Sequence, residues 1–221
     1  PEIGLAKRKE VHFFDNETVF SRKRSPYAYY ESWFDFTSDR KIYGEITPIY
    51  IYWEHSCKRI WTYNYKMKII AILRNPVDRA YSQWNMNVSR GVESLDFKDA
   101  MNAEKNRAKI CLPYQDRVYS YIDRGIYTEQ LRRLGRYFEQ HQLLFIKYED
   151  FLEKPEIIMN DIFRFLGVDQ DLYKHQHEEV FCIPKQRSIT HDERLFSYKF
   201  FKHDIESLEN YLNWNCKNWK V

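Results

Sequence analysis

Two short runs of apolar residues stand out along the chain, and both have the features of buried β-strands. Residues 68–73 are rich in β-branched side chains and are followed by Asn75 and Pro76. Residues 143–146 are wholly apolar and lead into a polar stretch. Uninterrupted apolar runs of this length are typical of strands covered on both faces, as in parallel sheets. Residues 42–46 are a shorter candidate strand.

Between and after these runs, apolar residues recur every three or four positions, which is the spacing of an amphipathic helix. Pro76 fits the first turn of a helix extending to about Val88, because the missing N–H of proline costs nothing there. A later helix should begin at Pro155 and end at Gly167. The repeats are Tyr127, Leu131, Leu134 and Phe138, then Ile158, Ile162 and Phe165, and finally Ile205, Leu208 and Leu212. This alternation predicts an α/β domain of three layers with a central, mostly parallel sheet.

Length and composition favour one globular domain, which we expect to cover residues 1–221. Hydrophobic residues make up 43% of the chain and aromatic residues 18%, so disorder is excluded. The 35 Lys and Arg residues against 32 Asp and Glu residues leave a net charge of +3, too slight to indicate a nucleic-acid partner. The longest apolar run, residues 69–73, is far shorter than the ~20 residues of a membrane helix, so no membrane span is expected.

Neither the cysteines nor the histidines predict a metal site. His175 and His177 are two positions apart, which suits a metal only on a strand, yet they follow a predicted helix among polar residues. The four cysteines are far apart, with no zinc-type spacing: Cys57, Cys111, Cys182 and Cys216. We expect them to be reduced, in the cytoplasm. The chain begins with Pro1 rather than methionine, so we expect it to be a fragment whose upstream targeting signals are not visible.

Arg74 directly follows the first apolar run. In open α/β sheets, ligands bind beyond the carboxyl ends of the strands, so this guanidinium is expected in the ligand crevice. Ser82 lies about two turns into the helix that Pro76 begins. The planar guanidinium of Arg74 and the hydroxyl of Ser82 are donors that suit a phosphate group. The alternative is that Arg74 pairs with Asp78 and that Ser82 is an ordinary surface residue.

Residues 73–82 resemble the 3′-phosphate-binding motif of sulfotransferases that use 3′-phosphoadenosine 5′-phosphosulfate (PAPS). The version in this chain is similar to that of the Golgi-type heparan sulfate sulfotransferases and their bacterial relatives. The resemblance implies a P-loop nucleotide-kinase-like fold, and it implies that Arg74 and Ser82 hold the 3′-phosphate of the nucleotide.

Other segments agree with this resemblance in order and spacing. Residues 9–14 are similar to the family segment K-E-x-x-F-F, whose glutamate is the proposed catalytic base, so the resemblance implies that role for Glu10. Tyr121 and Tyr127 match the element Y-x-x-x-G-x-Y, which implies that Tyr127 lies at the nucleotide. Further similar stretches are residues 44–48, 147–150 and 213–219.

Sulfuryl transfer needs a base, because the acceptor must lose a proton. Lys7, Arg8 and Lys9 precede Glu10, and their positive charges favour its ionised form. His12 would share a face with Glu10 if this segment is extended, and it could then orient the acceptor or assist the base. The alternative for Glu10 is a solvated member of a charged run.

The chain departs from the family at one point. Enzymes of this kind carry a loop of the type P-K-x-G-T-T, whose backbone amides and lysine hold the 5′-phosphosulfate. No such string occurs here, and the six glycines are scattered. We expect the chain to start just after that loop. The alternative is a protein that lacks the loop, for which activity would be in doubt.

Lys185 and Arg187 lie in a polar stretch at residues 181–190. The resemblance implies a loop that closes over the nucleotide, with these basic residues reaching the 3′-phosphate. A solvated basic loop is the alternative.

The function predicted from these features is transfer of a sulfuryl group from PAPS to a hydroxyl or amine of an acceptor, such as a carbohydrate or a small metabolite. The product of the co-substrate would be adenosine 3′,5′-bisphosphate, and no metal would be needed. Two alternatives belong to other classes. One is a non-catalytic module that keeps only the 3′-phosphate site. The other, a nucleotide kinase, is disfavoured because no Walker-type lysine is present.

Overall fold

The computed structural model describes residues 2–21, 27–37, 39–169 and 187–221. Contacts within the chain divide it into two compact units. The first consists of Pro1–Ile72 and Arg133–His177, and the second of Leu73–Arg132 and Glu178–Val221. The single domain expected from the length of the chain stays a prediction.

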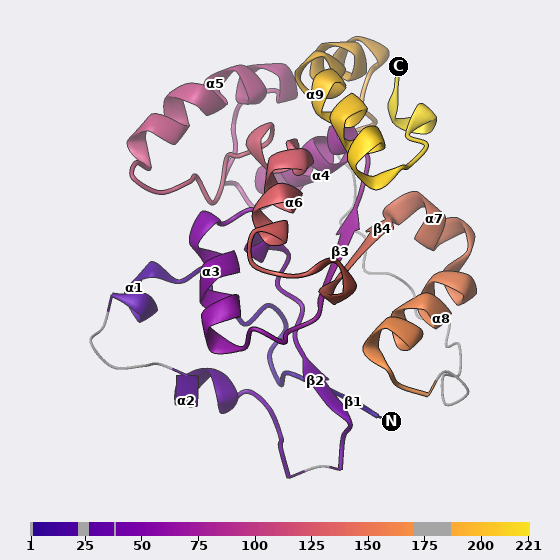
Figure 1. Cartoon of the computed structure of the whole chain (residues 1–221). Helices are drawn as coiled ribbons and strands as arrows, with labels where there is room; N and C mark the ends of the chain where they lie inside the picture. Colours follow the sequence, from indigo (N-terminus) through magenta and orange to yellow (C-terminus); the bar gives the residue numbers. More distant parts are fainter. Residues whose placement is uncertain (1, 22–26, 38, 170–186) are drawn as a thin grey trace. The chain divides into compact units, whose positions relative to one another are not determined.

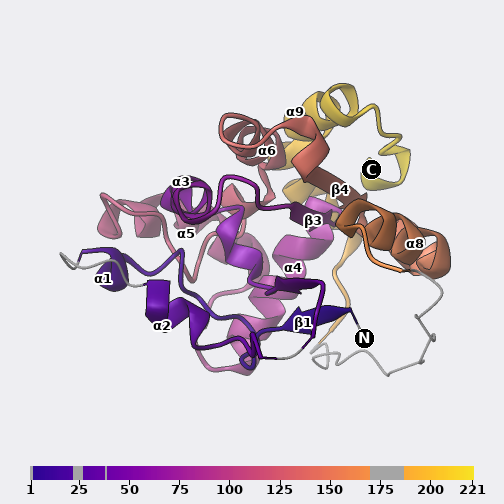
Figure 2. The ribbon, with the colours of Figure 1, turned by 60° about the horizontal axis from the view of Figure 1, so that its bottom comes forward.

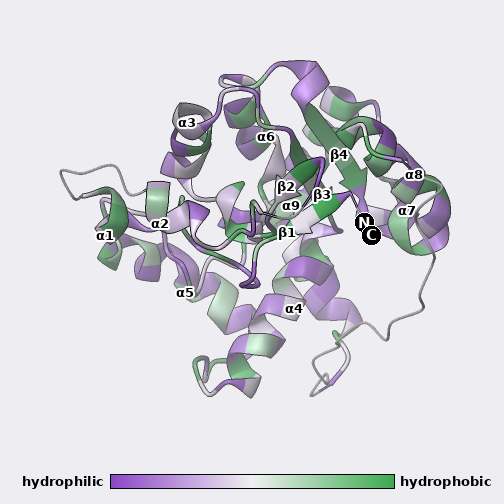
Figure 3. Cartoon of the chain, turned by 90° about the horizontal axis from the view of Figure 1, so that it is seen from below, coloured by the Kyte–Doolittle hydropathy of each residue, from purple (hydrophilic) through white to green (hydrophobic). Residues whose placement is uncertain are grey.

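The strands of the first unit form two small sheets. β1 (Ile3–Leu5) and β2 (Ile42–Gly44) are parallel, with Ile3 opposite Ile42. β3 (Ile69–Leu73), whose last residue opens the second unit, pairs with β4 (Leu143–Lys147). Figure 3 shows both strands of this second pair as largely hydrophobic. The three strands predicted from the sequence are confirmed. In the described residues they belong to two two-stranded sheets, whereas one central sheet was expected.

The helices of the first unit flank these strands. α8 (Pro155–Leu166) begins at its proline and ends at Gly167, which has φ +77°, as predicted. It contacts β4 (Figures 1 and 2) and α7 (Tyr148–Glu153) (Figure 1). The other helices are α1 (Glu17–Phe20), α2 (Tyr27–Glu31) and α3 (Glu54–Tyr63), with short 3-10 turns η1 (Pro48–Tyr50) and η3 (Gln140–Gln142).

Aromatic side chains make up much of the core near α1 and α2. Phe13 and Phe14 are each only 1% exposed. The ring of Tyr30 stacks on Phe13 at 4.8 Å and meets Phe14 edge-on at 4.9 Å. Such ring pairs stabilise a core beyond their burial. They also anchor residues 10–15, since two of these rings belong to that segment.

The second unit is built on three helices. α4 (Pro76–Ser89) contacts α5 (Phe97–Ile110) and α9 (His191–Leu212), and α5 contacts α9 (Figure 1). The unit also contains η2 (Asp123–Gly125), η4 (Lys217–Trp219) and the start of α6 (Tyr127–Gly135). Side chains of the three main helices supply much of the core: Val77, Ala80, Trp84, Phe97, Ala100, Met101, Phe201, Ile205 and Leu208. The predicted helices at 76–88 and around 205–212 are confirmed.

Three further properties can be read from the described residues. No helix among them is both long enough and apolar enough to cross a bilayer. No group of three or more His, Cys, Asp or Glu side chains in the same residues could hold a metal ion. Cys57 and Cys111 are free thiols. His175, His177, Cys182 and Lys185, which the sequence singled out, lie outside the described residues.

Candidate functional site

Glu10 and His12 lie together in a loop of the first unit, with Asp15 behind them. The Nε2 atom of His12 is 3.3 Å from Oε2 of Glu10, and its Nδ1 atom is 3.0 Å from Oδ2 of Asp15. The Asp15 side chain is fully buried, whereas 42% of Glu10 and 38% of His12 remain exposed. The imidazole therefore links an accessible carboxylate to a buried one.

The backbone of this loop is not extended. Glu10 and His12 have φ angles of +55° and +54°, in the left-handed region that non-glycine residues seldom occupy. The two side chains meet because of this conformation and not because they alternate along a strand. Asp15 was not predicted, because its burial beside His12 is visible only in the structure.

Hydrogen bonds to its backbone hold the loop in place. The N–H of Phe13 donates to the hydroxyl oxygen of Tyr50 at 2.9 Å, and that hydroxyl donates to Oε1 of Glu45 at 2.9 Å. Burial, together with the Glu45 carboxylate, raises the pKa of Tyr50, so this hydroxyl stays protonated. The guanidinium of Arg59 donates to the carbonyl oxygen of Phe14 at 2.9 Å. Glu45 belongs to the stretch 44–48 that resembles the family, and here it supports the loop of Glu10.

Arg59 is itself held by Glu17. Its two terminal nitrogens lie 3.0 Å and 2.5 Å from the carboxylate oxygens. Burial opposes ionisation of this carboxylate, but hydrogen bonds from Arg59, Trp53 and His55 prevail and lower the pKa of Glu17 to about 2. The support of the loop is therefore charged and fully paired at neutral pH.

Replacing Tyr50 by phenylalanine tests this support. The change leaves the N–H of Phe13 and the Glu45 carboxylate without their shared partner, so we expect a loss of ~1–2 kcal/mol in the free energy of unfolding. Turnover should fall by about tenfold, because the loop of Glu10 is less well placed. Urea unfolding and initial rates measure the two effects. Tyr65→Phe is the control, because Tyr65 is 61% exposed. Equal effects of both variants would contradict the role of the Tyr50 hydroxyl in holding the loop.

Of the predicted phosphate-binding residues in the second unit, Arg74 lies just before α4 and Ser82 lies midway along it. The side chain of Asn75 caps this helix by accepting the N–H of Val77 at 3.0 Å, and Pro76 occupies its first turn. Arg74 precedes the cap and is partly buried, and Ser82 is exposed. Asp78, which could have paired with Arg74, forms an ion pair with Arg194 at 2.7 Å.

Tyr127 is brought to Arg74 by a direct contact. Its hydroxyl donates to the carbonyl oxygen of Arg74 at 2.9 Å, so it holds the main chain next to the guanidinium. Asp204 accepts the N–H groups of Tyr127 and Thr128, at 2.6 Å and 3.1 Å, and caps the start of α6. Burial raises the pKa of Asp204.

Gly125, just before Tyr127, is required by packing. A Cβ atom at this position would lie 2.6 Å from the ring of Phe201. With any side chain here, either this backbone or the Phe201 ring would have to shift. The close approach of Phe201 thus explains why glycine occupies this position of the Y-x-x-x-G-x-Y element.

Arg187 lies against α4, but its guanidinium is paired. Its two terminal nitrogens are 2.7 Å and 2.6 Å from the carboxylate oxygens of Glu193. The guanidinium also lies over the Trp84 ring, and the Arg187 carbonyl accepts the hydroxyl of Tyr81 at 2.8 Å. The hydrogen bonds from Arg187, first among the causes, lower the pKa of Glu193 to about 2. Part of the charge of Arg187 is thus already balanced.

Acid should weaken the second unit, because two of its buried carboxylates ionise unusually easily. The pKa of Glu93 is about 2, since bonds from Arg107, the Leu95 amide and Tyr121 outweigh its burial. Glu193 has a similar value. A carboxylate with a pKa lowered from 4.5 stabilises the fold above pH 4.5 and loses that effect as the pH falls toward 2.

We therefore expect the free energy of unfolding to fall by ~2 kcal/mol per group between pH 4.5 and pH 2. Urea unfolding at a series of pH values measures it. Glu93→Gln should make the decline shallower, since one of the two titrating groups is removed. Equal stability at pH 5 and pH 3 in the wild type would contradict the assignment.

The chain is similar to known sulfotransferases. The family model described as a sulfotransferase domain matches residues 53–215. The human heparan sulfate glucosamine 3-O-sulfotransferase 3B1 is 28% identical over 181 residues, which is 80% of this chain and 44% of that protein. The membrane-associated sulfotransferase kil1 of Dictyostelium discoideum is 21% identical, over 98% of this chain and 61% of its own length. This chain thus spans about half the length of such relatives.

The fold comparison leads to the same family. A crystal structure of a sulfotransferase from Alicyclobacillus acidocaldarius has a TM-score of 0.81 and 26% sequence identity, over 99% of this chain and 89% of that one. The match of the family model covers most of the chain, and it includes Arg74, Ser82 and Tyr127. The chain therefore belongs to the sulfotransferase family and has its α/β fold.

Proposed function

We propose that this chain transfers a sulfuryl group from PAPS to a hydroxyl or amine of an acceptor. The observation that carries the proposal is the arrangement of Glu10, His12 and Asp15, in a chain of the sulfotransferase family. An accessible carboxylate beside an imidazole, with a buried carboxylate behind it, is suited to remove a proton from a hydroxyl.

Each of these residues would have a separate task. The carboxylate of Glu10 accepts the proton of the acceptor hydroxyl. His12 orients that carboxylate through its Nε2 atom, and Asp15 fixes the ring through Nδ1. When bound, PAPS supplies the sulfuryl group and a phosphate leaving group. The reaction balances as acceptor hydroxyl plus PAPS giving sulfate ester, adenosine 3′,5′-bisphosphate and a proton.

Arg74, just before α4, and Ser82, within α4, suit the 3′-phosphate of this nucleotide. Arg74 offers a planar guanidinium and Ser82 an exposed hydroxyl, which are donors that a phosphate group accepts. Tyr127 contributes by holding the backbone of Arg74. Arg187 adds positive charge near Tyr81, with Glu193 as its partner, and Lys185 is assigned the same task from the family pattern.

A carbohydrate hydroxyl is the acceptor class to test first, because a similar human protein is named as a glucosamine 3-O-sulfotransferase. The full protein should be incubated with PAPS and a panel of polysaccharides, lipids and small metabolites. Mass spectrometry should then show a product heavier by one SO3 group. ATP in place of PAPS tests for kinase activity.

Two results would contradict the proposal. Phosphorylated product from ATP would point to a kinase. Tight binding of adenosine 3′,5′-bisphosphate, with no sulfated product from any acceptor class, would favour the non-catalytic module instead.

A further inference from the structure

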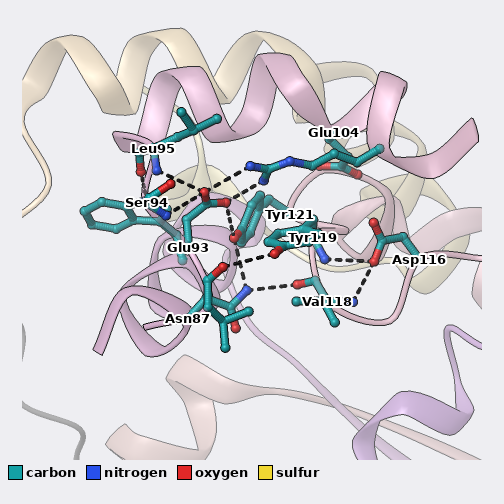
Figure 4. A network of polar contacts seen from close by, with 12 residues as sticks. Asn87, Glu93, Ser94, Leu95, Glu104, Asp116, Val118, Tyr119 and Tyr121 are labelled. Atoms are coloured by element: carbon teal, nitrogen blue, oxygen red, sulfur yellow. Dashed lines mark hydrogen bonds and ion pairs between the residues drawn. The ribbon is translucent and has the colours of Figure 1, made fainter. Parts of the chain in front are cut away.

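The connection between α5 and α6, residues 111–126, contains little regular structure but is held by polar side chains of its neighbours (Figure 4). On α4, Gln83 and Asn87 lie one turn apart and share a face. Their side-chain amides donate to the carbonyl oxygen of Val118, at 2.8 Å and 2.9 Å. The helix that begins at the proposed 3′-phosphate site therefore determines the course of this connection.

Tyr121, within this connection, is held by hydrogen bonds to both its main chain and its hydroxyl. Arg79 of α4 donates to its carbonyl oxygen. Its hydroxyl donates to Glu93 at 2.9 Å and accepts from Asn87 at 3.0 Å (Figure 4). Glu93 is also paired with Arg107 at 2.5 Å. All of these partners belong to the second unit, so they account for the position of the Tyr121 ring without any ligand.

Glu104 of α5 holds the next two residues, and no role in the proposed reaction has been given to it. Its carboxylate accepts the N–H of Ile122 at 2.6 Å and the N–H of Asp123 at 2.8 Å. These are the N–H groups with which the turn η2 begins. Glu104 is only 5% exposed, because it lies on the α5 face that packs into the core. A buried carboxylate is costly unless it is hydrogen-bonded, and in the part of the chain that the structure describes this one bonds two main-chain N–H groups.

Burial and the two N–H bonds act on the pKa of Glu104 in opposite directions. Burial raises its pKa to about 7, although the two N–H bonds and the positive charge of Arg79 oppose this shift. The carboxylate of Asp123 adds to it. Glu104 thus changes its protonation state near neutral pH, and a protonated carboxyl accepts these two N–H groups less well.

The backbone that Glu104 holds leads directly to Tyr127. From Asp123, the turn η2 runs to Gly125, which is packed against Phe201, and Tyr127 follows two residues later. The hydroxyl of Tyr127 then bonds the carbonyl oxygen of Arg74. A contiguous set of bonds therefore connects α5 with the main chain of the proposed phosphate-binding arginine.

We propose that Glu104 is a positioning residue for the nucleotide site. By fixing the backbone at Ile122 and Asp123, it places the Tyr127 hydroxyl so that Arg74 presents its guanidinium to the 3′-phosphate of the nucleotide. This proposal rests on the proposed function, because it assumes that Arg74 binds that phosphate.

The test is the preference for a nucleotide with a 3′-phosphate. Calorimetry should compare binding of adenosine 3′,5′-bisphosphate and adenosine 5′-monophosphate to the full chain. In Glu104→Ala, we expect affinity for the bisphosphate to fall by about tenfold and affinity for the monophosphate by less than about threefold. Glu104→Gln, which keeps one acceptor and is the milder change if the alanine variant does not fold, should show a smaller loss of the same kind.

Met101→Ala is the matched control. Met101 is 1% exposed on the same helix, and its sulfur contacts Ser197 of α9, so its truncation lowers stability without removing the carboxylate that bonds Ile122 and Asp123. Its melting temperature should fall while the preference for the 3′-phosphate stays as in the wild type. A similar loss of preference in this control would mean that any damage to α5 has the effect, and it would overturn the proposal.

A pH profile separates positioning from general stability. In the wild type, the preference for adenosine 3′,5′-bisphosphate over the monophosphate should weaken between pH 8 and pH 6. This weakening should be about threefold larger than in Glu104→Gln. Ionisation of the phosphate itself contributes equally to both proteins, so their difference isolates Glu104. Identical profiles would overturn the proposal.

A wild type without preference for the 3′-phosphate would overturn the proposed function and this proposal with it. A wild type with that preference, and a Glu104→Ala variant that weakens both nucleotides equally, would overturn the role of Glu104 alone.

Discussion

Replacing Glu10 by glutamine is expected to lower the turnover number for sulfuryl transfer by about a hundredfold or more. The amide has nearly the shape of the carboxylate but cannot accept the proton of the acceptor. Affinity for adenosine 3′,5′-bisphosphate should stay nearly unchanged, because the described bonds of the Glu10 side chain are made within its own loop. Single-turnover rates and calorimetry measure the two quantities separately.

Glu153→Gln provides the control for this change. Glu153 is 71% exposed in the same unit and lies 3.8 Å from the exposed Lys154, so its neutralisation should alter neither quantity. Full activity of Glu10→Gln would remove Glu10 from the mechanism. Asp15→Asn should give an intermediate loss, because the imidazole of His12 would keep its neighbour but lose the buried negative charge behind it.

Replacing Arg74 by alanine should weaken binding of adenosine 3′,5′-bisphosphate by about 2 kcal/mol or more, which is close to thirtyfold. The loss arises because a charge-assisted pair with the 3′-phosphate disappears. Adenosine 5′-monophosphate lacks that phosphate, so its affinity should change much less. Titration calorimetry with both nucleotides gives the comparison directly.

Arg90→Ala is the matched control for Arg74→Ala. Arg90 is an exposed arginine at the other end of α4, so its removal changes the net charge equally without reaching the start of the helix. It should leave both affinities close to those of the wild type. Equal losses for the two nucleotides in Arg74→Ala would show that Arg74 does not read the 3′-phosphate.

The elements that the sequence predicted well are those with strong local signals. β3 and β4 are uninterrupted apolar runs, and α4 and α8 begin at prolines. α5 was not predicted, because its buried face combines Phe97, Ala100 and Met101 with the charged Glu104. β1 was missed as well, since three residues with a central glycine have no distinctive pattern.

The candidate site was only partly predictable for a similar reason. Glu10 and His12 could be named from their residue types and from the family resemblance, but their contact depends on left-handed backbone that the sequence does not reveal. Asp15 becomes recognisable only through its burial, and Tyr50 through a bond to a residue far away in the chain. Such tertiary contacts have no local sequence pattern.

The pairing of β3 with β4 also has a consequence for synthesis on the ribosome. Residues 74–142 lie between the two strands, so β3 leaves the exit tunnel long before its partner exists. During that interval its apolar side chains are uncovered, and pairing over such a sequence separation is slow. We therefore expect a chaperone that covers β3 during this interval to protect the nascent chain from aggregation.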